Sequence, residues 1–492
     1  MFRIARPILK TAAALTLLSG LALAVVVLGF AFLSRSKHPP LAPWHRLDLE
    51  EEFHAGRADV KSFEDYLRLE DRLFAELHKR LLDDPSAADP FVLGRYHAGS
   101  PAAQRAWDTR YNRSFELKQD HPVGAVLLVH GLSDSPYSMR AIADTFYEQG
   151  YDVVALRLPG HGTTPSMLKD ISWQDWYAAV DLAARYTQSR AGPGKPFLAG
   201  GHSTGAALVT LYALRSLDDP SLPRPSRLYL MSPAIGIDDL AFMTNVLAGL
   251  SSIPYFESSA WLDVLPEYDP YKYNSFPVNA GKQIYRVTRE LSRAFAREGE
   301  AGKLGGMPHV TVFHSLVDAT VKSVDVVKGL LALLPDNGNE LVVFDVNRTE
   351  KLQGLIASAP IAYLEKLRAA TDAPFRITLV ANRSADSADV ATYSRPARSS
   401  KIEVADLPLA WPAGVVSLGH VAIPFPPDDP VYGLTPAADG MAPYPLGAFS
   451  ARGENGALVV PLDLLARLRS NPFFDVIRAT VERTCREDSG AR

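Results

Sequence analysis

The stretch Leu198 to Gly205, which reads LAGGHSTG, most strongly constrains what this chain can fold into. It contains Gly201-x-Ser203-x-Gly205, the spacing of a nucleophile elbow, in which a serine occupies a sharp turn between a strand and a helix. The two glycines leave room for a strained backbone and for close neighbours, so the serine hydroxyl can project into a cleft. Because glycine and serine are common, the context of the pentapeptide decides its meaning.

Strand-like and helix-like segments alternate on both sides of this turn. The run 124–129 is apolar throughout, which is typical of a strand buried on both faces of a parallel sheet. The alternation predicts a mainly parallel sheet with crossover helices. The expected strands are 111–118, 124–129, 152–156, 196–199, 310–313, 340–346 and 375–380, and the expected helices are 139–149, 173–188, 206–214, 360–370 and 472–484.

Composition removes several classes of function. The net charge of −4 over 492 residues gives no electrostatic basis for binding nucleic acid. The single cysteine, Cys485, excludes an internal disulfide framework and a thiolate metal cluster. The sequence also has no HExxH zinc motif, no Walker loop and no dinucleotide fingerprint after the first strand, so we expect neither a metal nor a cofactor.

The N-terminal region contains an uncharged stretch, 11–34, that is long enough to cross a hydrocarbon core as a helix. We interpret residues 1–36 as a transmembrane anchor. The rival interpretation is a cleaved signal peptide with Ala22-Leu23-Ala24 at the cleavage site, but the apolar run continues well past it. Three basic residues precede the span and two follow it, which favours a cytoplasmic N-terminus and an extracytoplasmic or periplasmic catalytic domain.

The remaining chain divides into unequal segments. Residues 37–105 have helical periodicity and are expected to form a stalk or cover, and 106–485 form the main domain. The residues after 485 form a charged tail, 486–492. Two insertions are expected, an aromatic-rich helical cap at about 234–307 and a second insertion at about 347–412. Within the second insertion the stretch 382–400 is polar and rich in Ser and Ala, and we expect a flexible loop there.

Three signatures follow one another in a recognisable order. A buried strand ends in His130-Gly131, the next ends in Leu158-Pro159-Gly160-His161-Gly162, and the elbow Gly201-His202-Ser203-Thr204-Gly205 comes third. Their order and spacing resemble the α/β-hydrolase fold, particularly its branch of monoacylglycerol lipases and carboxylesterases. The resemblance implies an α/β fold with a mainly parallel central sheet and a helical cap insertion, here preceded by the N-terminal transmembrane helix.

The elbow serine needs partners, because a serine hydroxyl is a poor nucleophile without a base that a third group orients. The resemblance implies the chain order serine, acid, histidine. Asp318 follows the apolar strand 310–313, where this family carries its acid. Asp325 and Asp345 remain alternative acids, the first in a following helix and the second within a strand.

The base must follow the acid in this order. Of the histidines after Ser203, His309 and His314 flank the strand that precedes Asp318, so the order leaves His420. It follows the strand-like segment 415–418 and a turn glycine. The sequence after it, IPFPPDDP at 423–430, is similar to that of bacterial members of the family. We therefore predict Ser203, Asp318 and His420 as the catalytic residues.

The oxyanion of an acyl-transfer intermediate needs two backbone donors. The resemblance implies that these are the amides of Thr204, directly after the nucleophile, and Leu132, directly after His130-Gly131. The histidines at 130, 161 and 202 are expected to be structural.

These features predict a membrane-anchored serine hydrolase that cleaves carboxylic esters, with a lipid-like or short-acyl ester as substrate and the membrane as its other partner. Two alternatives stay open. An amidase or peptidase would use the same triad, since both reactions pass through an oxyanion. A non-catalytic, membrane-tethered binding protein could retain the fold.

Overall fold

The computed structural model describes residues 20–21, 39–236, 254–318, 320–349, 358–433, 441–448 and 469–488. One ten-stranded sheet runs through this part of the chain in the order β1-β3-β2-β4-β5-β8-β9-β10-β11-β12. The strands from β3 to β10 in this order pair in parallel, whereas β1, β11 and β12 pair antiparallel at the two edges. The predicted mainly parallel sheet is therefore confirmed.

The strands of the main sheet are β1 Phe115–Leu117, β2 Gly124–Val129, β3 Tyr151–Leu156, β4 Phe197–His202, β5 Arg227–Met231, β8 His309–Ser315, β9 Glu340–Phe344, β10 Arg376–Asn382, β11 Asp389–Arg395 and β12 Glu403–Ala410. A separate two-stranded sheet pairs β6 Trp261–Asp263 with β7 Phe276–Pro277. The α-helices are α2 Phe63–Leu77, α3 Pro101–Trp107, α4 Arg140–Glu148, α5 Trp173–Ala191, α6 Thr204–Arg215, α8 Val278–Glu300, α9 Ser323–Gly329, α11 Ser358–Ala369 and α12 Phe474–Asp488.

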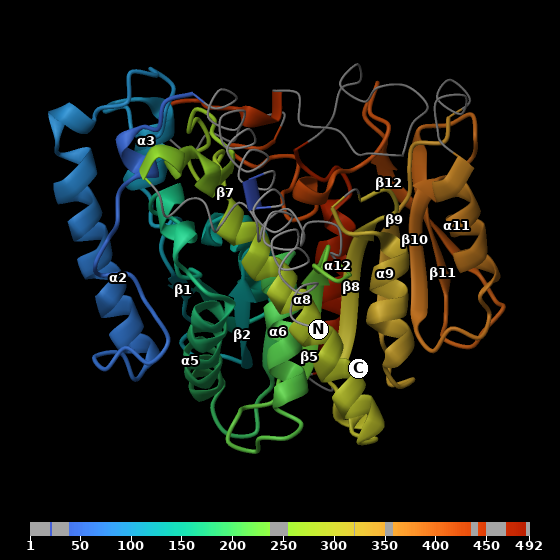
Figure 1. Cartoon of the computed structure of the whole chain (residues 1–492). Coiled ribbons are helices and arrows are strands. Elements are labelled where there is room, and N and C mark those ends of the chain that lie inside the picture. The colour runs from blue at the N-terminus through green and yellow to red at the C-terminus, as the bar shows by residue number, and fades with distance from the viewer. Residues whose placement is uncertain are drawn as a thin grey trace, which may run out of the picture.

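Helices cover both faces of the sheet (Figure 1). Side chains alternate along each strand, so Leu127 of β2 belongs to a buried cluster with residues of α5, α6 and α8, while its neighbour Leu128 belongs to a second cluster with residues of α4 and α12. Burial on both faces explains why the central strands are continuous apolar runs. Helix α2 lies beyond β1 at one side of the molecule, and β10–β12 with α11 lie at the opposite side.

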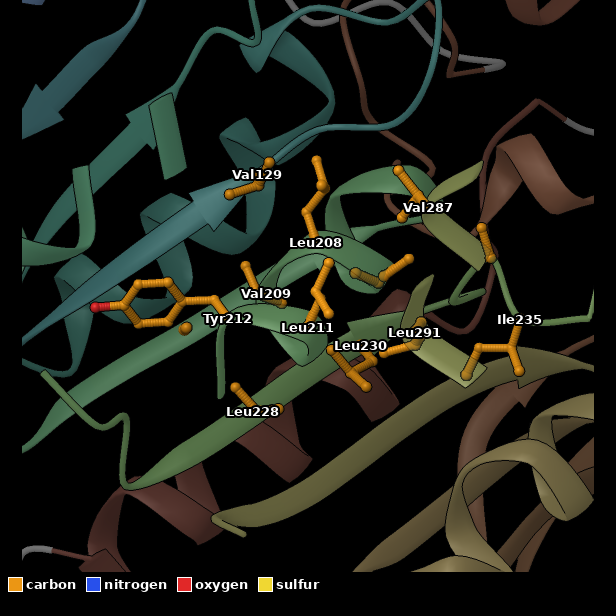
Figure 2. Close-up of a cluster of buried hydrophobic side chains, with 14 of the residues drawn as sticks. Val129, Leu208, Val209, Leu211, Tyr212, Leu228, Leu230, Ile235, Val287 and Leu291 are labelled. Atoms are coloured by element: carbon orange, nitrogen blue, oxygen red, sulfur yellow. The ribbon is translucent and has the colours of Figure 1, made fainter. Parts of the chain in front are cut away.

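Helix α6, which follows the elbow, is buried almost all round. Figure 2 shows Leu208, Leu211 and Tyr212 of this helix among side chains from the neighbouring strands and from α8. All three are at most 1% exposed. A helix surrounded in this way cannot shift without opening the core, so it holds the elbow at a fixed position.

The second insertion extends the sheet. The expected strand 375–380 and helix 360–370 correspond to β10 and α11, but the expected loop at 382–400 is wrong, since β11 occupies Asp389–Arg395. The strand-like segment 415–418 is also no regular strand. Strand β12 is a largely exposed edge strand and β11 beside it is partly exposed, and such strands carry the polar residues that made this region resemble a loop.

A buried ion cluster joins the N-terminal segment to the core. The Arg157 guanidinium, at the end of β3, donates to Glu52 at 3.0 Å and to Glu70 at 2.8 Å, and its side chain is 0% exposed. Glu52 also accepts from the Gly160 amide, and the Arg157 guanidinium donates to the His161 carbonyl. The cluster therefore fixes the loop after β3 as well as the N-terminal segment.

The prediction of a membrane-anchored chain with an extracytoplasmic catalytic domain is corrected by the structure. Across the described residues, no helix is both long and apolar enough to span a bilayer. The longest helix described, α8, has 23 residues but carries charges along its length, including Lys282, Arg289 and Glu290. The span expected at 11–34 lies outside the described residues except for Gly20 and Leu21.

The segment expected to form a cap has two different environments. Its second half forms α8, whose Val287, Leu291 and Phe295 pack into the main core beside α6. The preceding stretch from Pro254 to Pro277 contains β6 and β7 and lies over the carboxyl ends of the strands, where the Tyr273 amide donates to the Ser133 carbonyl at 2.8 Å. At the other terminus α12 continues into the expected tail, and Arg227 binds Asp488 at 2.8 Å.

Candidate active site

Ser203 occupies a strained turn between β4 and α6. Its backbone has φ 50° and ψ −112°, a conformation that L-residues adopt rarely and that costs about 1–3 kcal/mol. The surroundings hold this conformation, because the Ser203 amide donates to the Met231 carbonyl at 2.9 Å and its carbonyl accepts from the Ala234 amide at 3.1 Å. Both partners belong to the end of the adjacent β5, so the neighbouring strand stabilises the turn.

The two glycines of the elbow are required by close backbone approaches. A Cβ on Gly205 would lie 2.0 Å from the Val129 carbonyl oxygen, and one on Gly201 would lie 2.5 Å from the Gly205 carbonyl carbon. Real side chains do not reach such distances. The glycines therefore allow α6 to begin directly against the end of β2, the strand that leads into the His130-Gly131 loop.

Asp318 and His420 meet at the carboxyl end of β8. His420 Nδ1 lies 2.7 Å from Asp318 Oδ2, and the Asp318 side chain is 0% exposed. The other oxygen, Oδ1, accepts from the amides of Thr320 at 2.8 Å and Val321 at 2.9 Å. Burial alone would raise the pKa of Asp318, but the His420 imidazole and these donors hold it well below its usual range. The ionised carboxylate keeps the His420 proton on Nδ1, so Nε2 is left as the basic nitrogen.

After the second insertion, hydrogen bonds hold the segment before His420 close to the ends of β8 and β9. The Asn347 amide donates to the Val416 carbonyl at 2.7 Å, and the Asn347 side chain donates to the Val415 carbonyl at 3.0 Å. The Ser315 hydroxyl donates to the Leu418 carbonyl at 2.8 Å. Since Ser315 ends β8 and Asn347 follows β9, the segment before His420 is tied to the ends of two central strands.

His202 links the elbow to the loop that carries His420. Its Nε2 lies 3.2 Å from the His420 carbonyl oxygen, and the two ring centroids are 5.1 Å apart. On the other side, His202 Nδ1 lies 3.3 Å from Asp134 Oδ2. Ser203, the next residue, and His420 are each 8% exposed. The structure thus brings the elbow, Asp318 and His420 together at the carboxyl ends of the central strands.

His130 orients the peptide that carries one predicted oxyanion donor. Its Nε2 accepts from the Leu158 amide at 3.0 Å, so its Nδ1 is the protonated nitrogen and donates to the Gly131 carbonyl at 2.8 Å. Because carbonyl and amide point in opposite directions across a trans peptide, this bond also fixes the direction of the Leu132 amide. Thr204 begins α6, where backbone amides have no acceptor within the helix.

The alternative residues are occupied elsewhere. The Asp345 carboxylate binds Arg348 and the Val346 amide, and Asp325 lies in the first turn of α9. His309 begins β8, at the opposite end from Asp318. His314 is 1% exposed and lies 3.9 Å from Asp318, but neither of its ring nitrogens has a hydrogen-bond partner among the described residues. Burial lowers the pKa of His314.

A cavity of about 430 Å³ opens beside His420. Aromatic and charged side chains share its wall, and most of them come from the segment before α8. Sequence reasoning missed the charged residues, since they belong to no motif. The lining includes Ser133, Asp134, Asp263, Tyr268, Asp269, Lys272, Tyr273, Phe276, Thr320, Phe425, Tyr432 and Arg469.

The fold and the strained serine beside a histidine–carboxylate pair define a serine hydrolase of the α/β-hydrolase fold. The family described as serine aminopeptidase, S33, matches residues 120–294. A thermostable monoacylglycerol lipase from Bacillus sp. strain H-257 is 37% identical over 180 residues, which span 36% of this chain and 67% of the relative. The chain belongs to this α/β-hydrolase family, is homologous to monoacylglycerol lipases, and is a lipase/esterase-like hydrolase.

Two further similarities were found, each at lower sequence identity. Phospholipase YtpA from Bacillus subtilis strain 168 is 31% identical over 121 residues, which span 24% of this chain and 44% of the relative. A solved structure from a study of the metagenome-derived lipolytic enzymes LipS and LipT is 23% identical, with a TM-score of 0.37, and covers 47% of this chain and 86% of its own. The family and the monoacylglycerol lipase relative confirm the predicted enzyme class.

Proposed function

We propose that this protein hydrolyses lipid-like carboxylic esters through an acyl-enzyme on Ser203. Asp318 orients His420, and His420 is the general base. The observation that carries this assignment is the 2.7 Å bond from His420 Nδ1 to Asp318, at the carboxyl ends of the central strands, where Ser203 occupies its strained turn. The backbone amides of Leu132 and Thr204 are the proposed oxyanion donors.

In acylation, His420 Nε2 takes the Ser203 hydroxyl proton while Oγ bonds to the ester carbonyl carbon. The carbonyl electron pair moves onto its oxygen, and the two amides stabilise the resulting oxyanion. The oxyanion then collapses and the carbon–oxygen bond to the alcohol breaks. The alcohol leaves with the proton held by His420. The same groups next activate a water molecule, which attacks the acyl carbon, returns the proton to Ser203 and releases the carboxylic acid.

A monoacyl ester of a small alcohol is the proposed substrate class. The homologous Bacillus sp. strain H-257 protein is a monoacylglycerol lipase. The cavity beside His420 combines apolar side chains, such as Leu265 and Phe276, with polar ones. This mixture suits an ester with an aliphatic chain on one side and a polar alcohol on the other.

We also propose the domain division 37–105 for the cover, 106–485 for the hydrolase domain, about 234–307 for the cap and about 347–412 for the second insertion. The buried ion cluster of Arg157 with Glu52 and Glu70 supports a cover packed tightly on the hydrolase domain. The sheet-extending strands β10–β12 support an insertion that is structural and does not supply the base.

A fluorophosphonate probe, which reacts with activated serines, tests the assignment. The parent protein should be labelled and should hydrolyse p-nitrophenyl esters, whereas Ser203→Ala and His420→Ala should lose both properties. Ser216→Ala is the matched control, because Ser216 is buried at the far end of α6 and its hydroxyl donates to the Ala213 carbonyl within the same turn. Equal labelling of the parent and Ser203→Ala would overturn the proposal.

The description of the matched family as a serine aminopeptidase keeps amide hydrolysis as the second candidate. The two activities share every proposed catalytic group, so substrates must separate them. We expect a p-nitrophenyl acyl ester to be turned over and the matched p-nitroanilide to be left intact. Faster turnover of the anilide would favour the peptidase.

A further inference from the structure

The loop that follows β2 has a strained residue next to one proposed oxyanion donor. Ser133, directly after Leu132, has φ 63°, a left-handed conformation that residues other than glycine rarely adopt. Such a conformation persists only where contacts from the surrounding structure hold it. The direction of the Leu132 amide depends on this loop. The contacts that hold the loop therefore also decide whether this donor points at the oxyanion.

Two of these contacts come from the segment before α8. Lys272 Nζ lies 3.0 Å from Asp134 Oδ1, and the Tyr273 amide donates to the Ser133 carbonyl at 2.8 Å. The side chains of Asp134 and Lys272 are 7% and 30% exposed, so solvent screens their ion pair only partly. Two adjacent residues of the segment thus bind two adjacent residues of the loop, one through its charge and the other through its backbone.

Asp134 also joins the loop to the elbow. Its Oδ2 lies 3.3 Å from His202 Nδ1, and His202 Nε2 lies 3.2 Å from the His420 carbonyl oxygen. A Cβ on Gly131 would lie 2.9 Å from both Asp134 Oδ2 and His202 Nδ1, so the loop packs directly on the elbow. Burial alone would raise the pKa of Asp134, but the Lys272 ammonium and the His202 imidazole hold it well below its usual range. The ionised carboxylate therefore faces both partners at once.

The segment that carries Lys272 is itself fixed. The Lys272 amide donates to Asp269 Oδ1 at 3.1 Å. The Tyr273 hydroxyl donates to the Gly160 carbonyl at 3.1 Å and accepts from the Thr163 amide at 2.8 Å. Because both residues are anchored through groups that do not contact the loop, the loop rests on a rigid support.

We infer that Lys272 and Asp134 are positioning residues that hold the loop 131–134 in the geometry that stabilises the oxyanion. This inference deepens the proposed hydrolysis at Ser203 and rests on it. Lys272 also lines the cavity beside His420, but its ammonium is paired with Asp134. Loss of this pair should therefore impair the chemical step and leave substrate binding intact, since only the transition state carries the charge that the loop stabilises.

Two compounds with the same heptyl chain on the reacting carbonyl separate these effects. One is the substrate p-nitrophenyl octanoate, and the other is 1,1,1-trifluorononan-2-one, which forms an analogue of the tetrahedral intermediate. In the proposed mechanism, Ser203 Oγ bonds to the ketone carbon, the carbonyl electron pair moves onto its oxygen, and the hydroxyl proton goes to His420. No group leaves, so the adduct keeps its oxyanion and its Ki reports on the loop.

Lys272→Met should lower kcat for the ester by about 10- to 100-fold and raise the Ki of the ketone by a similar factor, because the Leu132 amide is no longer held in place. Acylation and deacylation both pass through an oxyanion, so KM should stay within about twofold. Lys272→Arg keeps the cation and should recover most of the lost activity. Lys401→Met is the matched control, since Lys401 and Glu403 form an exposed pair, 74% and 53%, and it should behave as the parent.

Asp134→Asn is the second variant, and it leaves no buried carboxylate without a cation. It should show the same loss of kcat and the same rise in Ki as Lys272→Met. The double variant should lose no more than the larger of the two single losses, because both residues act through one contact. Circular dichroism verifies that each variant is folded. If Lys272→Met does not fold, the kinetics of Asp134→Asn decide alone.

Each other result contradicts a different statement. A rise in KM at unchanged kcat and Ki would make Lys272 a substrate contact, and unchanged kinetics in Asp134→Asn would show that the pair does not hold the loop. Either result overturns the inference and leaves the Ser203 mechanism unaffected. If the parent neither cleaves the ester nor reacts with the fluorophosphonate probe, the proposed function itself fails, and the inference fails with it.

Discussion

His420 Nδ1 and Asp318 Oδ2 lie 2.7 Å apart, although 102 residues separate them in the sequence. The intervening chain includes β9 to β12 and α11, which lengthen the sheet away from the site. His420 still reaches Asp318, because the segment before His420 is hydrogen-bonded to Asn347, which follows β9, and to Ser315, which ends β8. The second insertion therefore lengthens the sheet without separating His420 from Asp318.

Replacing the carboxylate tests this contact. Asp318→Asn should lower kcat for a p-nitrophenyl ester by about 10³–10⁴-fold with little change in KM, because an amide no longer holds the His420 proton on Nδ1. Asp325→Asn, at the alternative acid position in α9, should stay within about twofold of the parent. Steady-state kinetics of the two variants would decide between the acids, and a larger loss at Asp325 would reverse the assignment.

A pair of glycine substitutions tests the close approach of α6 to β2. Gly205→Ala places a Cβ 2.0 Å from the Val129 carbonyl oxygen, so we expect a loss of about 3 kcal/mol or more in the free energy of unfolding, together with weaker probe labelling. Gly305→Ala should change stability by no more than about 0.5 kcal/mol, because nothing lies within 4 Å of its Cβ. Urea unfolding of both variants provides the comparison, and similar losses would argue against the tight elbow.

The features that could be predicted from sequence are those that depend on local pattern. The apolar run of β2 and the glycine spacing around Ser203 each report burial and backbone geometry within a few residues, so they located the central sheet and the elbow. The family's chain order then selected Asp318 and His420. The structure brings these two residues together, as that order predicts.

The features that could not be predicted depend on distant contacts. Strand β12 is largely exposed, so its sequence lacks the apolar alternation that identifies a strand. The tether of Val416 to Asn347 joins segments 69 residues apart in a way that no motif encodes. Arg469 reaches the cavity from a segment without any recognisable pattern. The predicted membrane span rested on composition alone, and all of it except Gly20 and Leu21 lies outside the described residues.

Acid should destabilise the protein partly through His161. Burial lowers the pKa of this histidine to about 4, below the value of about 6.5 in the unfolded chain. Below pH 6.5 the unfolded state takes up a proton that the folded state excludes, so stability falls as the pH drops toward 4, by up to about 1.4 kcal/mol per pH unit. Above pH 6.5 this contribution is absent.

His161→Phe removes the titrating group while keeping a ring between Tyr273 and Trp176. The decrease of the unfolding temperature between pH 6.5 and pH 4 should therefore be shallower in this variant than in the parent. His121→Phe, at an exposed position, should reproduce the profile of the parent. The unfolding temperatures are measured by calorimetry between pH 6.5 and pH 4. Parallel profiles for the parent and His161→Phe would show that His161 does not contribute to the loss of stability in acid.

The buried ion cluster beneath the loop after β3 gives the largest expected effect on stability. Arg157→Met would leave the carboxylates of Glu52 and Glu70 buried without their cation, which should lower the free energy of unfolding by about 3–5 kcal/mol. The triple variant Arg157→Met/Glu52→Gln/Glu70→Gln removes the uncompensated charges and should recover much of that loss. Arg185→Met is the surface comparison, because its ion pair with Asp181 is 43% and 28% exposed and should contribute no more than about 1 kcal/mol. If urea unfolding showed equal losses for Arg157→Met and Arg185→Met, the cluster would not be what fastens the N-terminal segment to the hydrolase domain.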